Sequence, residues 1–208
     1  MTTRRLLLVL AAGLLPALPR PTLAQSDTAR ATAFIQATGE ELVSVINAAG
    51  VPIEQRRQRV AAILRRAVDV EGVGRFILGR YWRTATPEQQ QEYLQLFEET
   101  LIHNLASRFG EYQGVRFALG RNQSRTEEDA LVSTVVERPG MAPFSLDWRV
   151  ADVGGQPRVV DVIAEGTSLR LTQRSEYASV ISRNGGNVAA LLSAMRNQVR
   201  QLAGRAAG

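Results

Sequence analysis

The hydrophobic periodicity of this chain changes twice along its length, and that change restricts the fold more than any other feature. Apolar residues recur at helical spacings from Phe34 to Phe109, alternate with polar residues from Val115 to Ala164, and return to helical spacings after Gln173. Helical spacing predicts helices that bury one face, and alternation predicts half-buried strands. The order therefore predicts an α+β fold, in which N- and C-terminal helices wrap one face of a curved antiparallel sheet.

Glycine and proline clusters divide this pattern into separate elements. Helices are expected over residues 28–49, 53–68, 86–109 and 173–182 and from residue 187 onwards, with a short helix or turn over 71–82. About four strands are expected over residues 115–119, 131–137, 144–150 and 159–164. Short turns join these strands, which is typical of an antiparallel meander.

The helix that begins after Thr86 has the clearest start signal in the chain. Thr86 is suited to the N-cap, Pro87 to the first helical position, and Gln89 to a capping box. Its apolar stripe is wide and favours a helix laid over a sheet; it consists of Tyr93, Phe97, Leu101, Leu105 and Phe109.

Residues 1–24 have the three parts of a cleaved secretory signal. Arg4 and Arg5 precede the uncharged apolar run from Leu6 to Leu15, and Thr22-Leu23-Ala24 supplies small residues before a cleavage point. The run is shorter than the roughly 20 residues that a membrane span needs. The paired arginines also resemble a twin-arginine signal, so both export routes stay open.

We expect residues 25–208 to form one exported domain, with residues 204–208 as a frayed tail. The whole chain has a formal net charge of +5, but the leader holds three arginines and no acid. The remainder therefore has 22 arginines against 20 acidic residues, interspersed along the chain. This balance predicts no nucleic-acid partner.

The residue types that are missing argue against most catalytic mechanisms. The chain has no lysine and no cysteine, which excludes lysine bases, Schiff bases, thiol nucleophiles and thiolate metal sites. His103 is the only histidine and lies near an apolar stripe, so we expect a structural role for it. No catalytic residue, metal site or cofactor is predicted, and a hydrolase with an unrecognised site is a less favoured alternative.

The most unusual segment runs from the last predicted strand into the following helix. Asp161 lies inside an apolar strand, where a charge needs a partner, and Arg149 or Arg174 could supply one. Glu165-Gly166 is a break that would present the residues from Thr167 to Leu169.

Four segments, in this order, resemble the MlaC family of periplasmic phospholipid-binding proteins, also called toluene-tolerance or auxiliary transport proteins. They are Phe76–Pro87, Glu92–Leu101, Leu146–Arg149, and Ala164–Leu169 with the following Thr172–Tyr177. The resemblance covers roughly residues 30–200. The family usually has valine where this chain has Thr167, which affects the expected lining of the pocket.

The resemblance implies a curved sheet wrapped by helices, with an apolar cavity between them that holds acyl chains. It implies a periplasmic carrier that shuttles phospholipid between an inner-membrane ABC transporter complex and an outer-membrane lipoprotein complex, and so maintains outer-membrane lipid asymmetry. Two alternatives stay open: a carrier of hopanoid-type lipid, and a ligand-free adaptor of a membrane transport complex. The implied lipid-binding residues are Tyr81, Phe97, Leu101, Leu105, Phe144, Leu146, Trp148, Val162, Thr167 and Leu169.

Overall fold

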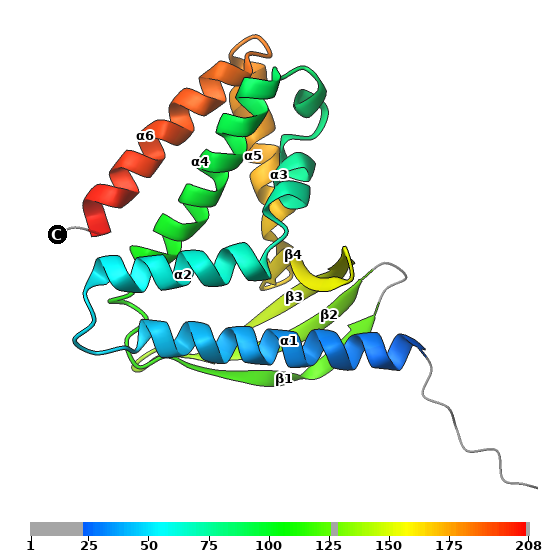
Figure 1. Ribbon diagram of the computed structural model, residues 1–208, viewed down its shortest axis with the longest axis vertical. Coiled ribbons are helices and arrows are strands. Elements are labelled where there is room, and N and C mark those ends of the chain that lie inside the picture. The colour runs from blue at the N-terminus through cyan, green and yellow to red at the C-terminus, as the bar shows by residue number, and fades with distance from the viewer. Residues whose placement is uncertain (1–22, 126–128, 207–208) are drawn as a thin grey trace, which may run out of the picture.

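The computed structural model describes residues 23–125 and 129–206, and residues 1–22 of the expected leader lie outside them. The fold is α+β, with six α-helices and a five-stranded antiparallel sheet among these residues (Figure 1). The helices are α1 (Leu23–Ile46), α2 (Ile53–Ala67), α3 (Val70–Leu78), α4 (Pro87–Ala106), α5 (Leu169–Arg183) and α6 (Val188–Ala206), and a 3-10 helix, η1, spans Gly79–Arg83. The strands are β1 (Arg116–Arg125), β2 (Ala130–Glu137), β3 (Phe144–Val153), β4 (Gln156–Ala164) and β5 (Thr167–Ser168).

The sheet is a meander in which each strand pairs with the next along the chain, as the alternating pattern predicts. The predicted count of about four strands misses β5, whose two residues pair with Ile163 and Ala164 at the end of β4. Glu165 and Gly166 make the tight link between them, with φ angles of 50° and 78°. A register shift between Arg149 and Val150 bends the sheet, as a β-bulge does.

Helices α1 and α2 lie across one face of the sheet (Figure 1). On β2 every second residue is buried, including Val132 and Thr134, so one strand face is enclosed beneath the helices. Helix α1 ends at Ile46, before the predicted residue 49. The Asn47 side chain explains this, because it donates to the Val115 carbonyl at 3.0 Å and accepts from the Gly114 N–H at 2.8 Å.

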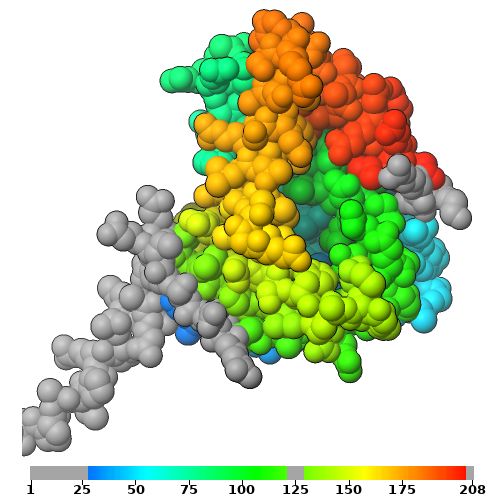
Figure 2. All heavy atoms as spheres, turned by 180° about the vertical axis from the view of Figure 1, so that it is seen from behind, coloured from blue at the N-terminus to red at the C-terminus, as the bar shows by residue number. Residues whose placement is uncertain are grey.

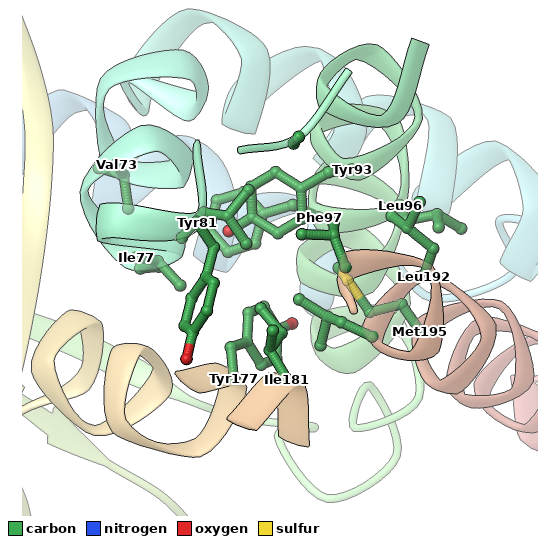
Figure 3. Packing of buried hydrophobic residues seen from close by; sticks show 14 residues of the cluster. Val73, Ile77, Tyr81, Tyr93, Leu96, Phe97, Tyr177, Ile181, Leu192 and Met195 are labelled. Carbon is green, nitrogen blue, oxygen red and sulfur yellow. The ribbon is translucent and has the colours of Figure 1, made fainter. Parts of the chain in front are cut away.

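The remaining helices form a second core beside the sheet-and-helix layer, built by α3, η1, α4, α5 and α6 (Figures 1 and 3). Tyr93 lies at its centre: its ring is 6.1 Å from that of Phe97 and 6.2 Å from that of Tyr177. The Tyr93 hydroxyl donates to the Gly74 carbonyl at 3.1 Å, which satisfies its one buried donor.

The capping box at the start of α4 is confirmed: the Thr86 and Gln89 side chains each accept from the other residue's backbone N–H. The expected partner of α4 is wrong. This helix packs mainly on α6 instead of lying over the sheet, and α1 takes the position on the sheet. A wide apolar stripe shows which side of a helix is buried, but helices and sheets bury such stripes equally well.

Candidate functional site

An apolar pocket of about 510 Å³ lies between the sheet and helices α1 and α2. Helix α1 contributes Leu42 and Ile46, α2 contributes Leu64, and the strands contribute Phe117 and Val162 among others. Its size falls within the roughly 300–1,000 Å³ typical of small-molecule sites. Figure 2 views the molecule from behind Figure 1 and shows a hollow bounded by α4, α5 and the strands.

The closeness of α1 to β1 limits the pocket on one side. A Cβ atom on Gly39 would lie 2.4 Å from the ring of Phe117, well inside van der Waals contact. Both residues line the pocket. Glycine at this position therefore lets the helix approach the strand while the Phe117 ring stays against the sheet side of the cavity.

The polar side-chain atoms at and behind Trp148 in the pocket wall form hydrogen bonds within the protein. The indole N–H of Trp148 donates to the Thr134 hydroxyl at 2.8 Å, and that hydroxyl donates to the Leu146 carbonyl at 3.1 Å. Thr134 is fully buried. Trp148 can thus present an apolar ring to the cavity without leaving a buried donor unsatisfied.

Six of the ten predicted lipid-binding residues line this pocket: Leu105, Phe144, Leu146, Trp148, Val162 and Leu169. Three others lie elsewhere: Tyr81 and Phe97 are buried in the helical core (Figure 3). Leu101 packs against that core. Thr167 is exposed in β5 and does not line the pocket. The structure thus divides nine of the ten predicted residues between two apolar clusters and leaves Thr167 outside both.

Sequence reasoning did not assign the part of the pocket wall that α1 and α2 contribute. Leu42, Val43 and Ile46 of α1, and Ile63 and Leu64 of α2, all line it. Their helical spacing marks them as buried, but residues that face a cavity and residues that face a filled core have the same spacing.

The expected partners of Asp161 are wrong. Arg149 pairs with Asp129 at 3.3 Å, and the guanidinium of Arg174 lies over the Phe76 ring at 4.8 Å. Asp161 instead accepts from the Ser168 hydroxyl at 2.6 Å and lies 3.4 Å from Nε of Arg170. The chain reverses at β5, which brings the start of α5 back over β4 and places these groups beside the carboxylate.

His103 is buried at the contact between α2 and α4, and its Nε2 lies 3.3 Å from Nη1 of Arg57. Burial, followed by the positive charge of Arg57, lowers the pKa of His103 below its ordinary value. Glu99 and Glu54 act in the opposite direction. Within residues 23–125 and 129–206, no group of three or more histidine or acidic side chains is arranged to hold a metal ion.

Comparison with known proteins identifies the family. The family model described as MlaC protein matches residues 36–197, which is most of the chain. The chain belongs to the MlaC family. None of the helices in the described residues has both the length and the apolar character that a membrane crossing requires.

Two curated relatives are similar to this MlaC-family chain at low identity. The toluene tolerance protein ttg2D of Pseudomonas putida is 26% identical over 127 residues, which are 61% of this chain and 59% of the relative. The intermembrane phospholipid transport system binding protein MlaC of Haemophilus influenzae is 21% identical over 176 residues, 81% of each chain.

A solved structure extends the similarity to the fold. A phospholipid-binding protein from Ralstonia solanacearum, solved in complex with a phospholipid, matches with a TM-score of 0.74 at 26% identity. The match covers 83% of this chain and 98% of that protein. The two chains therefore share the arrangement of helices around the sheet.

Proposed function

We propose that this chain is a periplasmic phospholipid carrier whose apolar pocket holds the acyl chains of its cargo. The observation that carries the proposal is the pocket of about 510 Å³ between the sheet and helices α1 and α2. It occurs in a fold that matches a protein solved with a phospholipid bound.

The pocket chemistry suits acyl chains. Among the described residues, Arg108 is the one charged residue that lines it, and aliphatic and aromatic side chains make up most of the wall. Each buried CH₂ group contributes about 0.8 kcal/mol, so a chain of about ten such groups gains about 8 kcal/mol before the cost of ordering it. Binding then needs neither catalysis nor a network of polar contacts.

The transport role is the finer part of the proposal. The leader-like residues 1–24 support export, and the Haemophilus influenzae relative is named for an intermembrane phospholipid transport system. We propose that the protein moves phospholipid between an inner-membrane ABC transporter complex and an outer-membrane lipoprotein complex. A carrier of this kind shields acyl chains from the water between two membranes.

Lipid extraction from the purified, exported protein tests the proposal. Mass spectrometry of the denatured protein is expected to find phospholipid at close to one molecule per pocket. Extraction of a polycyclic lipid would instead identify the protein as a carrier of hopanoid-type lipid. Recovery of no lipid, together with failure to take up lipid from vesicles, would contradict the carrier and favour a ligand-free adaptor.

A variant that fills the pocket tests whether the lipid binds in this cavity. Leu42→Trp adds a large ring to the α1 wall, and we expect it to reduce bound phospholipid severalfold because the ring occupies space used by the chains. Leu171→Trp is the matched control, since Leu171 is 56% exposed and does not line the pocket. Equal lipid content in the two variants would contradict binding in this pocket.

A further inference from the structure

Arg138, just after β2, is held between two aromatic rings of the pocket wall. Its guanidinium carbon lies 4.7 Å from the ring centre of Tyr112 and 5.4 Å from that of Phe144. Both rings line the pocket. Within the part of the chain that the structure describes, Nε of Arg138 is buried without a hydrogen-bond partner and its guanidinium forms no ion pair.

Arg108 is adjacent to Tyr112 in the backbone, since the Tyr112 N–H donates to the Arg108 carbonyl at 3.1 Å. It lies just beyond the end of α4 and lines the pocket. Its one ion pair in the described residues, with Glu111, is long at 3.8 Å, and the two side chains are 58% and 60% exposed. Such a pair contributes little, so the guanidinium can take another acceptor.

The nearby carboxylates leave a positive charge at this end of the pocket. Glu137 precedes Arg138 in the chain, but its carboxylate lies 3.3 Å from Arg116 on the neighbouring strand. Among the described residues, the ion pair of Glu111 is the long one with Arg108, so Glu111 is the acidic group that competes for the Arg108 guanidinium.

We infer that Arg108 and Arg138 form an anion site that binds the phosphate of a lipid headgroup while the acyl chains lie in the pocket. The inference rests on the proposed carrier function. Aromatic stacking orients the plane of the Arg138 guanidinium, and its edge can donate to two phosphate oxygens at once. Chains bound in the pocket keep the phosphate at a high effective concentration beside the pair.

A headgroup comparison tests this site in the delipidated, exported protein. Dioleoyl phosphatidic acid and dioleoylglycerol have the same chains, but dioleoylglycerol lacks the phosphate. We expect the wild-type protein to bind the phosphatidic acid about tenfold more tightly, as charge-assisted hydrogen bonds do. Arg138→Gln is expected to reduce this preference to about twofold or less, mainly through weaker binding of the phosphatidic acid.

The control variant is Arg59→Gln, because Arg59 is exposed on α2 and does not line the pocket. It is expected to keep the full preference. Arg108→Gln is the second test of the site and decides the outcome if Arg138→Gln does not fold. Unchanged uptake of dioleoylglycerol shows that the pocket of each variant is intact.

The outcomes separate this inference from the carrier function. Equal binding of both lipids by the wild type, or full preference in both arginine variants, overturns the anion site and leaves the carrier in place. Binding of neither lipid overturns the carrier itself. Titration with inorganic phosphate distinguishes a free anion: saturable binding below about 1 mM that Arg138→Gln abolishes would assign the pair to free phosphate and overturn the headgroup assignment.

Discussion

Asp161 shows how one buried carboxylate positions a helix, α5, next to the pocket. It accepts from the Ser168 hydroxyl at 2.6 Å and from the Arg170 N–H at 3.2 Å, and the Arg170 guanidinium lies alongside. The Ser168 hydroxyl in turn accepts from the Leu171 N–H. The first turn of α5 is thus tied to β4, which holds Leu169 at the pocket wall.

Replacing Asp161 by alanine is expected to lower the free energy of unfolding by about 3 kcal/mol, since it leaves the Arg170 charge without its partner. The Asp161 side chain is 2% exposed and that of Arg170 is 23% exposed. Urea denaturation measures the change. Asp152→Ala removes an exposed aspartate paired with Arg30 and is expected to cost about 1 kcal/mol or less. Equal losses in the two variants would contradict the role of burial.

His103 is expected to make stability depend on pH. Its pKa is below the ordinary 6.5 in the folded protein, so the unfolded chain binds the proton more readily. The free energy of unfolding therefore falls as the pH drops through the unfolded value toward the lower folded value. Denaturation curves recorded between about pH 7.5 and 5.5 check this decline.

The variant His103→Gln is the control for that titration. His103 is the only histidine in the chain, and glutamine can still accept a hydrogen bond from Arg57. The stability of the variant is expected to change less over the same pH range. Identical slopes in the two proteins would assign the pH dependence to other groups.

At the scale of elements, the approach of α1 to the sheet depends on a residue that weakens an isolated helix. Gly39 lies inside α1, where glycine costs about 1 kcal/mol relative to alanine. The Phe117 ring occupies the space that a Cβ atom would need. Close packing between α1 and β1 thus offsets the poor helix propensity.

We expect Gly39→Ala to lower the free energy of unfolding by about 1 kcal/mol, because overpacking outweighs the gain in helix propensity. A second change, Phe117→Leu, is expected to recover part of the loss. Thermal unfolding measures both effects. Gly204→Ala in α6 adds the same methyl group in open space and is expected to be neutral or stabilising. A stabilised Gly39→Ala variant would contradict the close contact.

At the scale of the whole molecule, two apolar clusters that look alike in sequence have different packing. The cluster of α3, η1, α4, α5 and α6 surrounds Tyr93, which is fully buried among aromatic and aliphatic side chains (Figure 3). The space between the sheet and α1 and α2 contains the pocket. We propose that the first supplies stability and the second supplies binding.

The same substitution in each cluster tests this division. Phe97→Leu in the helical core is expected to lower the free energy of unfolding by about 1–2 kcal/mol without changing bound lipid per protein. Phe144→Leu in the pocket wall is expected to alter the amount or chain length of bound lipid with a smaller loss of stability. Urea denaturation and lipid phosphate analysis measure the two effects. Loss of lipid in Phe97→Leu, with its fold intact, would contradict the division.

The sequence by itself determined the type and order of the elements, because periodicity and capping act over a few residues. The alternation at Phe144, Leu146 and Trp148 predicts β3, and Thr86 with Gln89 predicts the start of α4. Element ends were less predictable. Helix α5 begins at Leu169 instead of Gln173, since its first turn is held by Asp161 from another strand.

Only the tertiary structure decided which apolar residues line the pocket and which fill a core. Leu105 and Leu101 share one stripe of α4, yet the first lines the pocket and the second packs on the helical core. The partner of Asp161 was likewise decided by the reversal at β5. A hydrophobic pattern predicts that a side chain is buried. Whether that side chain borders a cavity depends on how elements that are distant in the sequence pack against one another.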